Sequence, residues 1–226
     1  MDLILYGSPL SPFVRKVRAC MLEKGLDCEL DPVSPFDPPD GWRKLSPLGR
    51  IPVLRDLAVG KEGPDGTLAD SSAICVYLER LQPEPRLYPA DPFAHARSVW
   101  YEEYADTELA VRIGFGIWRT VVVGPLNGQE PDWDTAEATV REKLPRSFAY
   151  LEEQFAADTP YLTGTEPGIG DIAVTAQLIG LRHAGFGIDA AAYPRLAVWL
   201  ERMLSRPSFT SLIAEDRERL GSHSRL

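Results

Sequence analysis

The 226-residue sequence predicts an α/β domain with a mixed four-stranded sheet, followed by an all-helical domain. Short strand-like and helix-like segments alternate over roughly the first 80 residues. Four prolines then fall within residues 83–92, where they would end a helix and stiffen the chain. No strand-like segment follows them. We therefore expect an α/β domain at 1–82, a linker at 83–92 and a helical domain at 93–226.

The α/β domain is predicted from apolar periodicity and turn residues. An apolar run at 3–6, closed by Gly7, indicates a buried strand. Residues 12–24 indicate a helix with one apolar face, and Arg15, Lys16 and Arg18 are expected on its opposite, polar face. The other expected elements are strands at 27–33, 51–54 and 67–69, a short helix at 42–45 and a helix at 72–81.

The helical domain is predicted from apolar positions three or four residues apart. The expected helices lie at 94–122, 140–155, 171–182 and 196–204. Gly114 and Gly116 should loosen the first of these helices, Pro145 should bend the second, and Pro207 should end the last. Asp171, in the first turn of a helix that is apolar nearly all round, is assigned to stabilising the start of that helix and not to catalysis.

Composition excludes several classes of function. With 24 basic and 33 acidic residues the net charge is −9, so general attraction for nucleic acid or an anionic membrane is not expected. No apolar run approaches the ~20 residues of a membrane span, and the N-terminus lacks the basic region of a signal peptide. The three cysteines and three histidines match no metal-ligand spacing, and an odd cysteine count fits a reducing compartment. A cytoplasmic protein without a metal is expected.

Ser11 is the first candidate site residue. Followed by Pro12, it is typical of a helix N-cap, which contributes about 1 kcal/mol. It also stands between a strand and a helix, where ligands of α/β sheets bind and where helix N–H groups favour an anion. Lowering a thiol pKa by two units from about 8.5 takes about 2.7 kcal/mol, close to one charge-assisted hydrogen bond plus the helix dipole. Both interpretations remain open from this motif alone.

Two further motifs have the same ambiguity. Ile51–Pro52 can mark a strand edge, or a cis peptide that exposes the backbone of Val53 to an extended ligand. Asp70–Ser71 can cap the next helix, or can bind the ammonium and carboxylate of an α-amino-acid head. Lys44 and Arg50 are solvated by default but could bind a second carboxylate. Together these motifs would hold a short peptide that carries a thiol.

These residues resemble the cytosolic glutathione transferase family over nearly the full length, with serine-type, bacterial-like members as the nearest pattern. The matching stretches are residues 5–18, 46–54, 70–74, 168–173 and 193–207. The resemblance implies a thioredoxin-like N-terminal domain, a helical C-terminal domain, a homodimer and glutathione as co-substrate. This sequence departs from the family pattern at Ser46, where many members have Asn, and at Gly168, where a Ser or Thr cap is usual. The turn at 56–66 also looks longer than usual.

The resemblance also implies roles for the motifs described above. The glutathione-binding residues would be Ser11, Lys44, Arg50, Ile51, Pro52, Val53, Asp70 and Ser71. Ser11 would stabilise the thiolate, Pro52 would be cis, and Val53 would pair with the cysteinyl backbone. The Asp70–Ser71 motif would hold the γ-glutamyl head, and the two basic residues would reach the glycyl carboxylate.

The electrophile pocket is expected between the two domains, a common place for ligands. Its candidate lining is Leu10, Tyr104, Glu108, Arg112 and Phe115. The last four are spaced by four, four and three residues, which places them on one helical face, although such a face can equally be core or solvent.

The expected function is attack of the glutathione thiolate on a small apolar electrophile. A glutathione-dependent disulfide or peroxide reductase is one alternative, but serine at position 11 counts against members that form mixed disulfides through their own cysteine. Ser11-Pro12-Phe13, where zeta-class isomerases carry Ser-Ser-Cys, makes maleylacetoacetate isomerisation less favoured. A non-catalytic binding module of the same fold is the other alternative.

Overall fold

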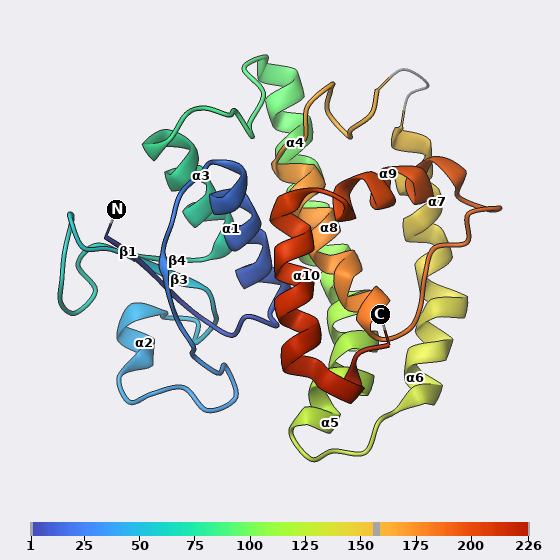
Figure 1. Cartoon of the computed structure of the whole chain (residues 1–226), viewed down its shortest axis with the longest axis horizontal. Helices are drawn as coiled ribbons and strands as arrows, with labels where there is room; N and C mark the ends of the chain where they lie inside the picture. Colours follow the sequence, from blue (N-terminus) through green and yellow to red (C-terminus); the bar gives the residue numbers. More distant parts are fainter. Residues whose placement is uncertain (1, 156–158, 226) are drawn as a thin grey trace. The chain divides into compact units, whose positions relative to one another are not determined.

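Four short strands form one mixed sheet in the N-terminal part of the computed structural model, which describes residues 2–155 and 159–225 (Figure 1). The strands are β1 (Leu3–Tyr6), β2 (Glu29–Asp31), β3 (Val53–Asp56) and β4 (Thr67–Ala69), in the order β2-β1-β3-β4. β1 is parallel to β2, whereas β3 is antiparallel to both β1 and β4. The predicted sheet is confirmed, with β2 shorter than expected and β3 beginning after Pro52.

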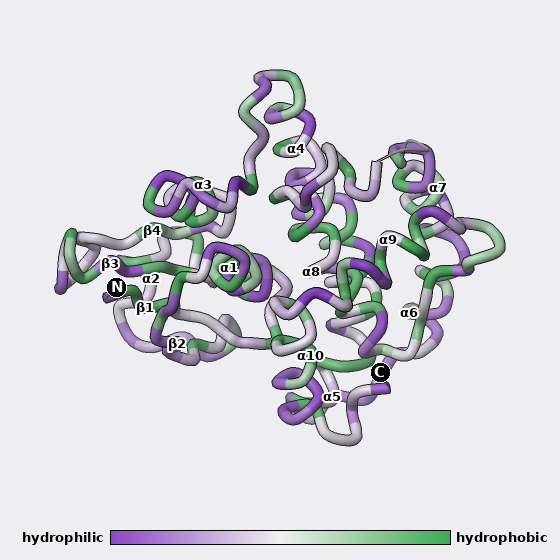
Figure 2. Tube along the Cα trace, turned by 45° about the horizontal axis from the view of Figure 1, so that its top comes forward, coloured by the Kyte–Doolittle hydropathy of each residue, from purple (hydrophilic) through white to green (hydrophobic). Residues whose placement is uncertain are grey.

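Three helices complete this part of the chain: α1 (Pro12–Glu23), α2 (Trp42–Leu45) and α3 (Ser71–Leu81). α1 and α3 pack against each other, and each carries hydrophobic and hydrophilic residues on different sides (Figure 2). Trp42 of α2 packs with Val33 and Val53 in a buried cluster. This cluster supports the start of β3.

The polar face expected for α1 is partly wrong. Arg15 and Lys16 are each 1% exposed, and only Arg18 keeps partial exposure. The ammonium of Lys16 donates to the Ser72 hydroxyl of α3 at 3.1 Å. Apolar periodicity reveals one buried face of a helix, but a second face covered by tertiary neighbours leaves no such signal.

The chain folds as two compact units, Met1–Leu87 and Tyr88–Leu226, with the boundary inside the proline-rich segment. The helical elements of the second unit are α4 (Pro92–Tyr104), η1 (Ala105–Val123), α5 (Gly124–Leu126), α6 (Trp133–Ala138), η2 (Thr139–Lys143), α7 (Leu144–Gln154), α8 (Ile169–His183), α9 (Pro194–Leu204), α10 (Pro207–Leu220) and η3 (Gly221–His223). α8 packs against α4 and η1, and every residue from Ile169 to Leu181 is buried. The expected core helix is confirmed, whereas α10 was not anticipated.

Proline shapes two of these helices. Pro145 has no N–H, and just before it the Leu144 N–H bonds to the Thr139 carbonyl, five residues back, which gives the wider turn of η2. The helical stretch begins at Trp133, earlier than predicted. Pro207 follows the end of α9, as expected, and is also the first residue of α10, a position that proline favours.

The stretch Pro92–Leu126 has the length and hydropathy of a membrane span, with a window of mean hydropathy 1.4 that is 44% buried. A core helix of a globular unit has the same properties. Leu109, Ile113 and Ile117 are at most 1% exposed. Their burial matches the packing of η1 on α8.

Candidate active site

The three predicted motifs converge at one end of the sheet. The register pairs Tyr6, the last residue of β1, with Val53, the first residue of β3, and pairs Val53 with Ala69, the last residue of β4. The segments that follow β1, precede β3 and follow β4 therefore lie side by side. These segments carry Ser11, Ile51–Pro52 and Asp70–Ser71.

Gly7 allows the chain to leave β1 close to its neighbours. Its φ is +154°, and a Cβ there would lie 2.6 Å from Val14 Cγ2 and 3.3 Å from Ile51 Cβ. Any side chain there would collide with Val14 and crowd Ile51. The loop from Gly7 to Ser11 is thus held between α1 and the Ile51–Pro52 segment.

Ser11 is the N-cap of α1, and its position allows both interpretations of the motif. Its Oγ accepts from the Val14 N–H at 3.5 Å, at the long limit of a hydrogen bond, and Pro12 is the first helical residue. The Ser11 N–H bonds to the Ser8 carbonyl at 3.0 Å, which closes the preceding turn. The cap uses a lone pair of the hydroxyl. Within residues 2–155 and 159–225 the hydroxyl proton has no acceptor, so it is available to an anion.

The Ile51–Pro52 peptide is cis, as the resemblance implied. The position of Val53 differs from expectation, because it lies inside β3 with β1 and β4 on either side. In an antiparallel ladder its N–H and C=O face a neighbouring strand and not a groove. Ile51 lies outside the ladder, and its backbone N–H and C=O have no hydrogen-bond partner among the described residues.

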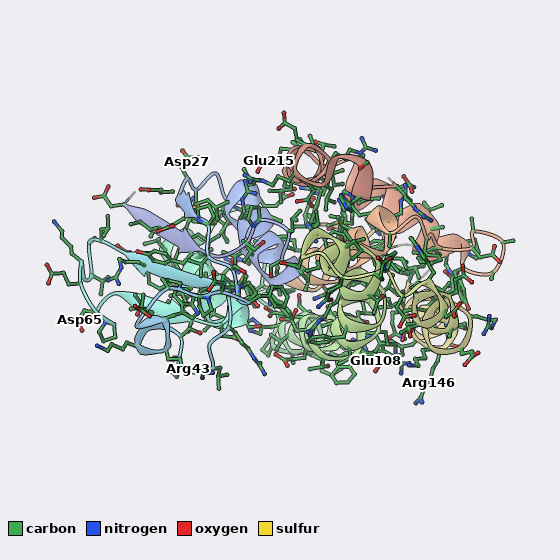
Figure 3. The ribbon with its side chains drawn as sticks, turned by 90° about the horizontal axis from the view of Figure 1, so that it is seen from below. Asp27, Arg43, Asp65, Glu108, Arg146 and Glu215 are labelled. Atoms are coloured by element: carbon green, nitrogen blue, oxygen red, sulfur yellow. The ribbon has the colours of Figure 1, made fainter. Side chains whose placement is uncertain are left out.

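Ser46 has a structural role next to the candidate site that the sequence did not reveal. It is 2% exposed, its Oγ donates to the Arg50 carbonyl at 2.8 Å, and the same oxygen accepts from the Arg50 N–H at 3.0 Å. This closes the loop that leads into Ile51. Lys44 and Arg50 themselves have exposed side chains, and Arg43, labelled in Figure 3, donates to the Pro47 carbonyl at 3.2 Å.

Asp70 connects α3 to the cis-proline segment. Its Oδ1 accepts from the N–H groups of Ser72 and Ala73 at 2.9 and 3.3 Å, and its own N–H lies 3.4 Å from the Pro52 carbonyl. Its φ of +103° is the only positive value at a non-glycine residue in the described parts of the chain. Such strain costs on the order of 1–3 kcal/mol and is concentrated at functional sites. Ser71 is only 3% exposed, so only a closely fitting ligand would reach its hydroxyl.

Two of the residues expected to line an electrophile pocket, Tyr104 and Glu108, contact α7. The Tyr104 ring lies 4.7 Å from that of Tyr150 on α7, and Glu108 pairs with Arg112 at 2.6 Å. Ser147 of α7 also donates to Glu108 at 3.2 Å. These contacts turn the side chains of Tyr104 and Glu108 toward α7.

Phe115 is 59% exposed, and Leu10 belongs to the loop before α1 in the first unit. Burial would raise the pKa of Glu108, labelled in Figure 3, but hydrogen bonds from Arg112 and Ser147 outweigh it and lower that pKa. Burial raises the pKa of Tyr104.

No cluster of three or more metal-binding side chains occurs in the described parts of the chain. Cys20 and Cys75 are buried, Cys28 is partly buried, and all three are free thiols. Burial is the main cause that raises the pKa of Cys28. None of the three thiols belongs to the segments that converge at the sheet.

Comparisons with known proteins agree with this architecture. The glutathione S-transferase N-terminal domain family matches residues 5–86, and the glutathione S-transferase C-terminal domain family matches residues 99–202. The chain is 28% identical to a glutathione S-transferase of Triticum aestivum over 218 residues, covering 95% of this chain and 94% of that protein. It is 30% identical to the GST-like protein YibF of Escherichia coli K12, covering 91% and 95%. The crystal structure of a Sinorhizobium meliloti glutathione S-transferase superposes with a TM-score of 0.83 at 27% identity, covering 99% and 96%.

This chain belongs to the glutathione S-transferase family and is an enzyme of that family. The fold is the one that the sequence predicted, a four-stranded mixed sheet domain followed by a helical domain. The converging motifs are therefore the candidate glutathione site.

Proposed function

We propose that this transferase is of the serine type, with Ser11 stabilising the thiolate of glutathione bound at the end of the sheet. The observation that supports this most directly is the register that brings Ser11, Ile51–Pro52 and Asp70–Ser71 together. A thiol, a peptide backbone and an amino-acid head are the three parts of glutathione that those segments suit.

At the thiol end, the Ser11 hydroxyl donates a hydrogen bond to the sulfur once it is ionised. The N-terminus of α1 adds its partial positive charge. The thiol proton is released to solvent, and the sulfur then attacks an electrophilic carbon, whose leaving group departs with the bonding electron pair. Thiolate population and proximity supply the rate enhancement.

In the middle of the ligand, the backbone of the cysteinyl residue pairs with Ile51. Ile51 replaces Val53 in this role because its N–H and C=O are the ones outside the ladder. Pro52 and Val53 form the end of the sheet against which the ligand lies. An extended peptide bound in this way gains affinity from main-chain hydrogen bonds, which do not depend on the side chains of the protein.

At the amino-acid head, Asp70 uses Oδ1 to cap α3, which leaves Oδ2 for the ammonium. The carboxylate meets the N-terminus of α3 and the Ser71 hydroxyl. Lys44 and Arg50 lie on the exposed loop side and suit the glycyl carboxylate, since both side chains are open to solvent.

We further propose a small apolar electrophile, with Leu10 beside Ser11 as its first contact, and a homodimeric, cytoplasmic enzyme of detoxification type. Isothermal titration with reduced glutathione and a conjugation assay with an aryl halide test the core of the proposal. No heat at millimolar glutathione would refute it. Activity on hydroxyethyl disulfide without conjugation would indicate a reductase in place of a transferase. Glutathione binding without either activity would indicate a binding module.

A further inference from the structure

We infer that Lys16 and Ser72 form a strut that positions the amino-acid head site relative to the sulfur site, an inference that rests on the proposed function. The two side chains join α1, which begins at Ser11, to α3, which begins beside Asp70. Neither is assigned to contact glutathione, so both are positioning residues.

The first observation is the burial of Lys16. Its residue is 1% exposed, and its Nζ donates to Ser72 Oγ at 3.1 Å. Removing an ammonium from water is costly unless good partners receive it. Such a group makes a stiff cross-link, because it cannot leave its partners without further loss.

The second observation is what Ser72 holds in turn. Its N–H donates to Asp70 Oδ1 at 2.9 Å, and the Asp70 N–H reaches the Pro52 carbonyl at 3.4 Å. Hydrogen bonds therefore run from Lys16 of α1, through the first turn of α3, to the strained cap and the cis-proline segment. Lys16 lies about one and a half turns after Ser11 on the same helix. The strut thus connects the elements that grip the two ends of the ligand.

A matched cross-link lies at the other end of the same two helices. Lys24, about two turns further along α1, pairs with Glu79 of α3 at 2.6 Å. Its Nζ also donates to the carbonyls of Gln82 and Pro85 at 2.8 and 2.9 Å. Lys24 is also a buried lysine, at 4% exposed, and its partners lie at the C-terminal end of α3 and just after it, away from Asp70. It is the natural control.

The strut has a consequence that a merely structural contact lacks. When the spacing between the two ends is set in advance, the γ-glutamyl head and the thiol bind without further ordering of the protein. Loss of the strut should weaken the binding of a ligand that occupies both the sulfur site and the amino-acid head site. Cysteinylglycine, which lacks the γ-glutamyl head, should be nearly unaffected.

The test compares S72A, K16M and K24M with the parent enzyme by titration of glutathione and of cysteinylglycine, with thermal unfolding of each. Because S72A loses one charge-assisted hydrogen bond, its affinity for glutathione should fall about tenfold, and its affinity for cysteinylglycine should change less than about twofold. K16M should show the same selectivity, and the double variant should lose little more, since the two residues act as one unit. K24M should lower the melting temperature and leave the ratio of the two affinities unchanged.

Equal weakening of both ligands in S72A, or the same ratio change in K24M, would overturn the strut. S72A is a small substitution and keeps the test valid if K16M fails to fold. Failure of the proposed function is distinct, because it appears as absence of glutathione binding by the parent enzyme.

Discussion

Replacing Ser11 by alanine should separate catalysis from folding. The hydroxyl has two roles, since its oxygen caps α1 and its proton is offered to the thiolate. The cap bond to Val14 is long, at 3.5 Å, so its loss should cost only about 0.5 kcal/mol, the low end for an N-cap. A hydrogen bond to a charged sulfur contributes about 1.5–3 kcal/mol.

The hydrogen bond to the sulfur is the stronger of the two, so it decides the kinetic result. Loss of the donor should raise the pKa of the bound thiol by about one to two units and lower kcat/KM at neutral pH about ten- to hundredfold. Glutathione affinity measured on the thiol form should change little, because the hydroxyl acts mainly on the ionised form. The melting temperature should fall by no more than a few degrees, as expected from the cap alone.

The assay is the pH dependence of kcat/KM with an aryl halide, together with glutathione titration and thermal unfolding. Ser8→Ala is the matched control, because Ser8 is assigned only to the turn before Ser11 through its carbonyl. If the pH profile of Ser11→Ala matched that of the parent enzyme, Ser11 would not stabilise the thiolate. A rate loss matched by an equal loss of folded protein would reduce its role to capping.

Three further predictions concern the support of the site and the core. Asp70→Ala should weaken glutathione binding. It should also destabilise the folded protein about 1 kcal/mol more than Asp70→Gly does, because glycine tolerates a φ of +103°. Equal free energies of unfolding for the two variants would contradict this. Ser46→Ala should lower the free energy of unfolding in urea by about 1–3 kcal/mol and weaken glutathione binding, because it releases both backbone groups of Arg50. Unchanged glutathione affinity would show that this loop has no role in binding. Burial raises the pKa of Asp171 to about 6. Between pH 4 and 6 the folded protein therefore keeps a proton on Asp171 that the unfolded chain has lost. The contribution of this group to the free energy of unfolding should fall by about 3 kcal/mol as pH rises through that range. Urea unfolding should show that slope in the parent and not in Asp171→Asn; a parent-minus-variant difference that grows with pH would have the wrong sign.

Asp171 also illustrates how local patterns predict local structure. Its place in the first turn of a helix assigned it to folding, and its carboxylate accepts from the N–H groups of Gly168 and Leu162 at 3.0 Å each and from Trp199 at 2.8 Å. The bond to Gly168 follows from sequence spacing. The bond to Trp199, on another helix, does not, because it depends on how α8 and α9 pack.

The sequence by itself determined the strands and most of the helices, because apolar period, proline and cap residues act within a few neighbours. It likewise marked Ser11 and Asp70 as helix starts. It did not predict α10 or the early start of the helical stretch at Trp133. Only the tertiary structure decided that Val53 lies inside the ladder while Ile51 stays open, and that Lys16 is buried against Ser72. Strand register and the covering of a second helix face depend on partners distant in the chain, and a periodic pattern in one segment contains no record of them.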